Sequence, residues 1–370
     1  MTDVLFSFVI PVRNREHTIC YCLDSILCQA FVCDYEIVVV DDASTDNTSV
    51  IIQKIADISS NQRLSDLDFC AELPETVALF SKISLQEEHA IRARIKIISL
   101  ISNEGAAAAR NVGINMAVGK YIWFVDSDDC ISKDSLSILH SLISKNSFDI
   151  LKFAKCSLNS NLPPCSYKLS TTEEIPRITY IEDISGLLFV LGHGAVWSSI
   201  FNREFIGNTR FNSKFSYSED SLFTWETALK ARSIAYLDYP LYGYMLTPGS
   251  LTSVKPFVRF ECYLRVIEEY ISAIRSSCKT AKEKKLLVKE CEKRVYTHAF
   301  YTYGVNEITL EMWNLWYSVY KNVMVNNSLR PIHKRVVSRI FYTIHCNKLF
   351  EMIFTLFYGK CVDCLRSRQQ

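Results

Sequence analysis

Four short, largely apolar runs in the first 130 residues constrain the fold more than any other feature of this sequence. They lie at residues 6–10, 36–40, 96–101 and 121–125. A short, near-continuous apolar run is typical of a parallel strand that is buried on both faces. These runs therefore predict four neighbouring strands of one sheet.

Between these runs, apolar residues recur at helical spacing. Helices are expected over about 16–30, from a cap at residues 44–46 to about 58, and over 105–118. Strands that alternate with helices in this way predict βαβ units with right-handed crossovers. The expected fold class is α/β: a Rossmann-like, mostly parallel sheet flanked by helices. Residues 59–94 lack clear periodicity and are expected to form an inserted excursion.

The remainder of the chain changes character at about residue 256. The pattern is mixed up to that point and helical beyond it, with helices expected over 257–276, over 281–303 and after 330. We therefore expect a domain over 1–256, with halves at 1–130 and 131–256, and a helical C-terminal region over 257–370.

Charge and hydropathy argue against several classes of protein. The formal net charge is +1, which argues against a nucleic-acid-binding protein. No apolar run reaches the roughly 20 residues of a spanning helix, and no secretory signal is recognised, so a cytoplasmic location with reduced cysteines is expected. The lone Cys361/Cys364 pair lacks a second pair at zinc spacing. Basic and apolar residues mixed over 330–350 fit a peripheral contact with the inner face of a membrane as well as a helix that covers the first domain.

Polar and acidic side chains collect where the predicted strands end. Asp41 and Asp42 follow the second run, and Asp126 and Asp128 follow the fourth. Ligands of open α/β sheets bind outside the carboxyl ends of the strands. Clustered carboxylates repel one another unless a cation or donor groups compensate, and hard oxygen ligands suit Mg²⁺ or Mn²⁺. An isolated Asp-x-Asp is often only a polar turn, but its place after a buried strand favours a metal-bound anionic ligand.

Five ordered motifs resemble the inverting, nucleotide-sugar-dependent glycosyltransferases of family 2, whose fold is called GT-A. The motifs lie at 8–14, 22–29, 36–48, 103–113 and 119–129. The resemblance implies that residues 1–130 bind a nucleotide-sugar and that residues 131–256 bind the acceptor. It implies a donor site made by Pro11, Val12, Arg13, Asn14, Asp41, Asp42, Asn103, Arg110, Asp126, Ser127 and Asp128.

Particular roles follow from the same resemblance. Asp42 and the turn at 11–14 would hold the nucleotide base, Asp126 would contact the ribose or diphosphate, and Asp128 would ligate Mn²⁺ or Mg²⁺ with help from Asp126. Arg110 would lie beside the donor. A surface cation on a helix is an equally good interpretation of Arg110.

A Glu219-Asp220 pair precedes an apolar helical pattern, and in the family such a pair supplies the general base. The match puts that role on Asp220, which would take the proton of an acceptor hydroxyl while a metal offsets charge on the departing diphosphate. The alternative is a helix start capped by Ser218, where acids favour the dipole. Both interpretations can hold together.

The sequence departs from the family in one segment. Met245 and Thr247 stand where relatives often carry a His or an Arg, so His193 or Arg210 would have to replace that contact to metal or diphosphate. Glu219, Trp197 and His193 are the candidates for contacts to the acceptor or the diphosphate. Trp197 fits a core aromatic equally well.

The resemblance implies transfer of a sugar, from a UDP-sugar in particular, to a glycan or lipid-linked saccharide, with inversion. The product would be a surface polysaccharide such as capsule, O-antigen or exopolysaccharide, and an oligomer is compatible with this. The alternatives are a non-catalytic nucleotide-sugar- or glycan-binding module, or a nucleotidyltransferase of similar fold. Asp126, Asp128 and Asp220 together favour the enzyme, and the GxGxxG and phosphate-loop fingerprints of other nucleotide enzymes are absent.

Overall fold

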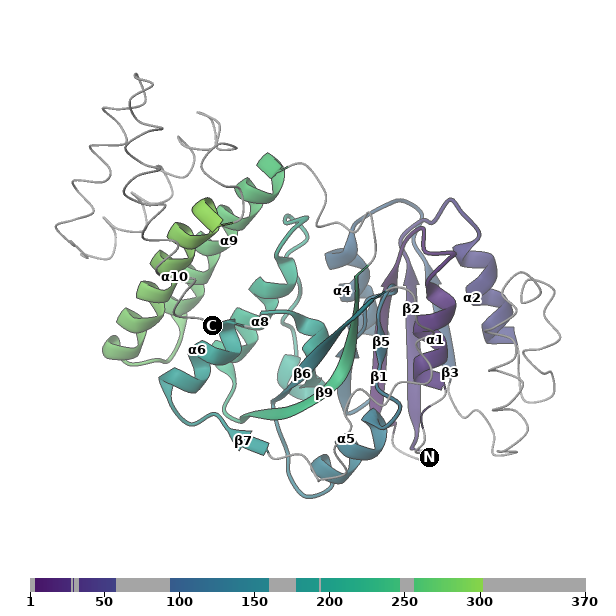
Figure 1. Ribbon diagram of the computed structural model, residues 1–370, viewed down its shortest axis with the longest axis horizontal. Helices are drawn as coiled ribbons and strands as arrows, with labels where there is room; N and C mark the ends of the chain where they lie inside the picture. The colour runs from purple at the N-terminus through teal and green to yellow at the C-terminus, as the bar shows by residue number, and fades with distance from the viewer. Residues whose placement is uncertain are drawn as a thin grey trace. The chain divides into compact units, whose positions relative to one another are not determined.

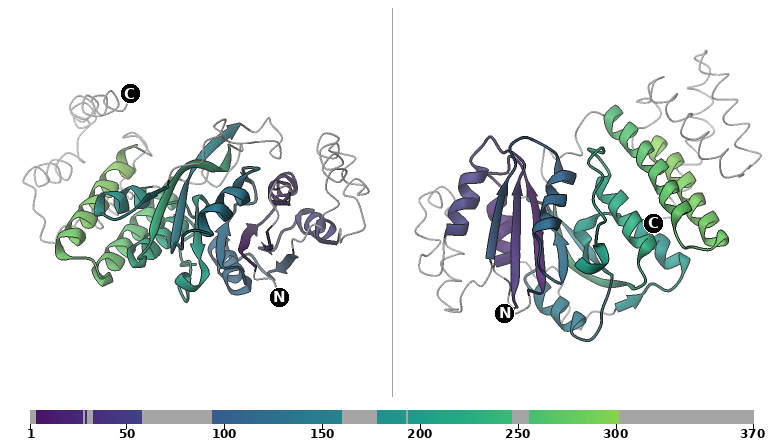
Figure 2. Two further views of the ribbon diagram at one scale, coloured as in Figure 1. Left: turned by 90° about the horizontal axis from the view of Figure 1, so that it is seen from below. Right: turned by 180° about the vertical axis from the view of Figure 1, so that it is seen from behind.

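One sheet organises the part of the chain that the computed structural model describes, which is residues 4–27, 29, 33–57, 94–159, 178–192, 194–246 and 256–301. The sheet has nine strands in the order β3-β2-β1-β4-β8-β6-β9-β5, with β7 paired to β9. Helices flank both of its faces (Figures 1 and 2). The predicted α/β class is confirmed, and the N-terminal half of the sheet is parallel.

The four predicted strands form the parallel part of the sheet. They are β1 (Phe6–Val12), β2 (Tyr35–Asp41), β3 (Arg94–Ser99) and β4 (Tyr121–Phe124). The predicted helices are α1 (Ile19–Leu27), α2 (Thr48–Asp57) and α4 (Ala106–Met116). Phe8 packs with α1 on one face of β1, whereas Val9 faces α4 so closely that a Cβ on Gly113 would lie 2.2 Å from its Cγ1. The strands are therefore covered on both faces, which explains their continuous apolar sequence.

Strand β1 continues through Pro11, where the sequence suggested that it would end. The carbonyl of Val12 accepts the N–H of Asp42 on the β2 side, and the carbonyl of Val9 accepts the N–H of Val125 on the β4 side. Along β1, the backbone groups of successive residues bond alternately to β2 and to β4. The backbone nitrogen of Pro11 therefore points to the β4 side, at a level that lies beyond the last residue of β4. A proline there has no ladder donor to lose.

Strand β3 begins and ends two residues earlier than predicted. It ends at Ser99, opposite Asp41 at the end of β2. Without a partner strand beyond that point the ladder stops, and Ile101 lies exposed.

The second half of the sheet is mixed. Its strands are β5 (Cys130–Ile131), β6 (Ile150–Asn159), β7 (Ile178–Tyr180), β8 (Ser199–Asn202) and β9 (Ile234–Leu246), and its helices are α5 (Ser135–Ile143), α6 (Ile184–Gly192), η4 (Val196–Ser198), α7 (Arg203–Ile206) and α8 (Glu219–Lys230). Strand β8 runs antiparallel to both β4 and β6, whereas β6 and β9 are parallel. The core continues across this junction, since the ring centroids of Trp123 and Phe153 lie 5.0 Å apart.

Two further helices, α9 (Pro256–Ser276) and α10 (Ala281–Tyr301), match the predicted helices at 257–276 and 281–303. Residues Met1–Cys291 form one compact unit and Glu292–Gln370 another. The first unit thus includes α9. The boundary at 130 between donor and acceptor halves and the boundary at 256 before the helical region stay predictions. Of the excursion expected at 59–94, Arg94 is the first residue of β3, and 59–93 lie outside the described residues, as do the segment 330–350 and the Cys361/Cys364 pair. Within the described ranges, no helix is both long and apolar enough to cross a membrane.

Candidate active site

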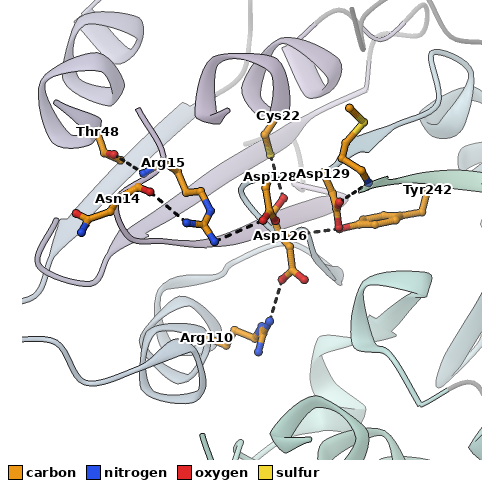
Figure 3. A network of polar contacts seen from close by, with 10 residues as sticks. Asn14, Arg15, Cys22, Thr48, Arg110, Asp126, Asp128, Asp129 and Tyr242 are labelled. Carbon is orange, nitrogen blue, oxygen red and sulfur yellow. Dashed lines mark hydrogen bonds and ion pairs between the residues drawn. The ribbon is translucent and has the colours of Figure 1, made fainter. Parts of the chain in front are cut away.

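An acidic turn follows β4 at the carboxyl edge of the parallel strands. Asp126, Asp128 and Asp129 share this turn, which is closed by the N–H of Asp129 donating to the carbonyl of Asp126 at 3.0 Å. Figure 3 shows Arg15, Cys22, Arg110 and Tyr242 approaching the turn from other parts of the chain. The edge therefore gathers ionisable groups that are far apart in the sequence.

Each carboxylate of the acidic turn has its own partner. Asp126 Oδ1 accepts from Arg110 Nη2 at 2.8 Å, and Asp128 Oδ2 lies 3.5 Å from Arg15 Nη2 (Figure 3). Asp129 accepts twice, from the Tyr242 hydroxyl at 2.6 Å and from the Met245 N–H at 2.8 Å. Asp129 is thereby held against β9, while Asp126 and Asp128 each keep one oxygen atom outside the contact with arginine.

The turn carries more negative charge than its partners neutralise. Burial, followed by the charge of Asp126, raises the pKa of Asp128 and raises that of Asp129 to about 8. A divalent cation would relieve this repulsion. No cluster of three or more His, Cys, Asp or Glu side chains suited to a metal occurs among the described residues. The oxygen atoms of Asp126 and Asp128 that lie outside the arginine contacts nevertheless fit Mg²⁺ or Mn²⁺, which take most of their ligands from phosphate and water.

Hydrogen-bond donors compensate the charges of Asp41 and Asp42, which is one of the two possibilities that the sequence left open. Asp41 accepts from the Ser44 N–H and from the Ser49 hydroxyl, and Asp42 accepts from the N–H groups of Glu104 and Gly105 at 2.6 and 2.9 Å. Both carboxylates are buried. Backbone and hydroxyl donors therefore balance this pair without a cation, and the pair fixes the loops that surround the edge of the sheet.

The turn after β1 is joined to the turn after β2. Asn14 adopts a positive φ of 50°, its N–H donates to Ser44 Oγ at 3.0 Å and its Oδ1 accepts the Thr45 N–H at 2.8 Å. Next to it, Arg13 Nη1 is buried without a hydrogen-bond partner. A buried, unpaired guanidinium nitrogen is costly, and an anionic or carbonyl ligand would satisfy it.

The other predicted donor residues lie around this edge. Pro11 and Val12 are buried in β1, Ser127 is buried in the acidic turn, and Asn103 is exposed after β3. None of these four contributes a side-chain contact that identifies a ligand.

Arg110 is not a surface cation, because only 5% of the residue is exposed. Its Nη2 bonds to Asp126, and its Nη1 bonds to Glu219 Oε1 at 2.8 Å. Burial opposes its charge, but the carboxylates of Asp126 and Glu219 outweigh burial and raise the pKa of Arg110. Arg110 thereby joins the acidic turn to the first residue of α8.

Asp220 lies beside that ion pair, at the start of α8. Burial, followed by the charge of Glu219, raises its pKa to about 7, against the opposing effect of Arg110. Ser218 has a positive φ of 60° and makes no side-chain capping bond, so the predicted serine cap is absent. A carboxyl that titrates near neutrality is suited to proton transfer.

The substitutes proposed for the missing basic residue do not take that role in the structure. Arg210 bonds through Nε and Nη2 to Asn115 and through Nη1 to the carbonyls of Gly207 and Thr209, so its donors are used in fastening a loop to α4. His193 and Thr247 lie outside the described residues. Arg15, which the sequence analysis did not select, is the cation nearest Asp128.

Trp197 lies in the core. It is 8% exposed, and its ring stacks on that of Tyr242 with centroids 4.5 Å apart and planes at 17°. Its carbonyl accepts the indole N–H of Trp123 at 2.8 Å. Of the two interpretations offered by the sequence, the surroundings of Trp197 fit a core aromatic. Tyr242, which links this stack to Asp129, had no signal in the sequence beyond its place in an apolar run.

Comparison with known proteins defines the class to which this fold and site belong. The family model described as glycosyl transferase family 2 matches residues 7–68 and 81–205. The chain belongs to this family, and the predicted class of protein, a family 2 glycosyltransferase, is confirmed.

Individual relatives are more distant. A poly(ribitol-phosphate) beta-glucosyltransferase of Bacillus spizizenii is 29% identical over 273 residues, which is 73% of this chain but only 37% of the relative. The UDP-Glc:alpha-D-GlcNAc-diphosphoundecaprenol beta-1,3-glucosyltransferase WfgD of Escherichia coli is 26% identical over 257 residues, 69% of this chain and 82% of the relative. The chain thus spans little more than a third of the Bacillus relative.

A solved structure gives the same fold. The S. aureus protein TarS, residues 1–349 in complex with UDP-GlcNAc, matches with a TM-score of 0.65 and 22% identity over 86% of this chain and 80% of that one. This likeness confirms the GT-A fold with its helical C-terminal region.

Proposed function

We propose that this chain transfers a sugar from a UDP-sugar to a glycan or lipid-linked saccharide, with inversion, during synthesis of a surface polysaccharide. The observation that carries the proposal is the Arg110 bridge between Asp126 and Glu219. It ties the acidic turn after β4 to the start of α8, where Asp220 lies. A donor-binding edge and a candidate base thus occur in one site, as a direct displacement requires.

In this proposal Asp128 and Asp126 hold Mn²⁺ or Mg²⁺ through the oxygen atoms left free in the acidic turn. The metal would offset negative charge on the diphosphate leaving group. The nucleotide would lie against the turn at residues 11–14 and the loops fixed by Asp42. Arg13 supports this placement, because its buried Nη1 has no hydrogen-bond partner among the described residues.

Asp220 acts as the general base. Its carboxylate takes the proton from an acceptor hydroxyl, whose oxygen forms a bond to the anomeric carbon as the bond from that carbon to the diphosphate breaks. Attack opposite the leaving group inverts the anomeric centre. Arg110 favours the ionised form of Asp220 against the repulsion of Glu219.

The acceptor class is proposed from the relatives. One is named for poly(ribitol-phosphate) and another for a sugar on diphosphoundecaprenol, so both names describe a phosphate-bearing acceptor. A cytoplasmic site of action, with residues 330–350 at the inner face of the membrane, would suit a lipid-linked acceptor. Those residues lie outside the described ranges, and the membrane contact stays a prediction.

The first test is release of nucleotide from a panel of UDP-, GDP- and dTDP-sugars in the presence of Mn²⁺, Mg²⁺ or EDTA. We expect metal-dependent release from one UDP-sugar, and its loss in Asp128→Ala. Asp238→Ala is the matched control, because Asp238 is an exposed carboxylate on β9. Asp220→Asn should bind UDP like the wild type yet lose transfer to an acceptor. Absence of binding to any nucleotide diphosphate by calorimetry would contradict the proposal, and binding without turnover would favour the non-catalytic module.

A further inference from the structure

Three segments meet at the start of α8, next to Asp220. Tyr270 of α9 is fully buried, and its hydroxyl lies 2.6 Å from Ser221 Oγ. Ser221 directly follows Asp220, and its N–H donates to Asp220 Oδ1 at 2.7 Å. A side chain from the C-terminal helices therefore reaches the residue that holds one oxygen of the candidate base.

The Tyr270 ring is itself held in place. It stacks on Trp225 with centroids 4.2 Å apart and planes at 10°. Trp225 lies one turn after Ser221 on the same helix, so Tyr270 contacts the first two turns of α8 together. Stacked aromatic rings of this kind add to the stability of a packed interface. The hydroxyl of Tyr270 is therefore fixed with respect to Ser221.

The backbone at Gly194 also approaches Ser221 closely. A Cβ on Gly194 would lie 2.4 Å from Ser221 Oγ, so a larger residue at this position would require a shift. Thr224 of α8 donates its hydroxyl to the Gly194 carbonyl at 2.7 Å. Ser221 is thus packed against Gly194 as well as hydrogen-bonded to Tyr270.

The start of α8 has tertiary as well as local contacts. Ser218 makes no side-chain capping bond, and the Ser221 N–H is taken by Asp220 Oδ1 instead. The contacts of the Ser221 side chain with Gly194 and Tyr270 join this first turn to other parts of the fold.

We propose that Tyr270 is a positioning residue for sugar transfer: through Ser221 it fixes the direction of the Asp220 carboxylate toward the acceptor hydroxyl. This inference rests on the proposed function, in which Asp220 is the base. It makes α9 part of the catalytic apparatus, although the family match ends at residue 205. Tyr270 acts through Ser221.

The test is Tyr270→Phe in the full-length chain, which removes the hydroxyl and keeps the stacked ring. We expect kcat for transfer to fall by about tenfold or more, because small displacements of a catalytic group are costly. The KM for donor and the affinity for UDP should not change, since the donor edge is untouched. A general loss of structure would instead change kcat, the KM for donor and the affinity for UDP together. Tyr263→Phe removes a hydroxyl from the same helix and serves as the control.

Ser221→Ala and the double variant complete the experiment. If the two hydroxyls act as one unit, Ser221→Ala lowers kcat like Tyr270→Phe, and the double variant is no worse than either. Wild-type kcat in Tyr270→Phe, or losses that multiply in the double variant, would overturn the inference. Wild-type protein that shows no transfer overturns the proposed function as well. An active wild type with an inactive Asp220→Asn and an unaffected Tyr270→Phe overturns the inference alone.

Discussion

Burial and charge act on Asp220 in opposite directions. Burial and the neighbouring Glu219 carboxylate favour its protonated form, while Arg110 and the Ser221 N–H favour the carboxylate. The outcome is a pKa of about 7. A base with a pKa near the working pH combines adequate ionisation with a strong tendency to accept a proton. The surroundings of this single residue therefore give it the properties that the proposed reaction needs.

We predict that kcat for transfer rises with pH through about 7, because Asp220 must be ionised to accept a proton and its raised pKa keeps it protonated below that value. Glu219→Gln removes a like charge and should move the midpoint of this rise to lower pH. The measurement is kcat at saturating donor and acceptor over a pH series. A flat profile, or a midpoint that moves to higher pH in Glu219→Gln, would contradict the assignment of the base.

At the scale of elements, Lys152 fastens η4 to the middle of the sheet. It lies on β6, is 1% exposed, and its Nζ donates to Ser198 Oγ at 2.8 Å. Weaker contacts reach Ser199 Oγ and the Ala195 carbonyl, both at 3.4 Å. Burial lowers the pKa of Lys152 to about 7, with Asp220 opposing. The short helix η4, which carries Trp197, is thus held by a lysine whose positive charge lowers the stability of the folded state.

Lys152→Met should change how stability depends on pH. The unfolded chain binds a proton at Lys152 up to its ordinary pKa of 10.5, whereas the folded chain releases it above about 7. Stability of the wild type should therefore rise with pH across this window, by about 5 kcal/mol at most. The variant should lack this rise, measured by urea unfolding at several pH values. Lys155→Met is the control, because Lys155 lies exposed on the same strand. Equal pH dependence in wild type and Lys152→Met would show that Lys152 stays charged.

At the scale of the whole molecule, the sheet order makes the site. Strands β1, β2 and β4 bring the turns at 11–14, 41–46 and 126–129 to one edge, and β8 and η4 lead the chain toward α8. Arg110 and Glu219 are 109 residues apart in sequence and yet form one ion pair. A ligand that binds across these segments stabilises only the folded arrangement.

UDP with Mn²⁺ should consequently raise the melting temperature of the full chain. At a UDP concentration 100 times its Kd, the folded state gains about 2.7 kcal/mol, and EDTA or Asp128→Ala should remove most of this gain. Differential scanning calorimetry with increasing UDP measures it, and Asp238→Ala again serves as the control. An equal shift in the presence of EDTA would contradict the metal-dependent part of the donor site.

Much of the N-terminal fold could be predicted because its signals are local. Phe8 and Trp123 lie in apolar runs whose composition and length suit buried strands, and both are fully buried. The errors concern partners. Strand β1 can continue through Pro11 because its neighbour β4 does not extend as far as the level of Pro11. Strand β3 stops early because its neighbour β2 ends at Asp41, and Ile101 therefore lies exposed beyond the ladder. For Asp41 and Asp42 the sequence left open whether a cation or donor groups compensate their charge, and neighbouring N–H and hydroxyl groups do so.

The order of strands and helices over the first 130 residues, the acidic run after the fourth strand and the family could all be inferred from the sequence, because periodicity and motifs reside in neighbouring residues. The pairing of cations with carboxylates could not: Arg15 lies by Asp128, and Arg110 bonds to Asp126 and Glu219. The same holds for the contact of Tyr270 with Ser221, and for Arg13 Nη1, which has no hydrogen-bond partner among the described residues. These contacts and the pKa values depend on distances and burial, which the packing of separate elements sets, in the pairs Arg15–Asp128 and Arg110–Glu219 across more than a hundred residues.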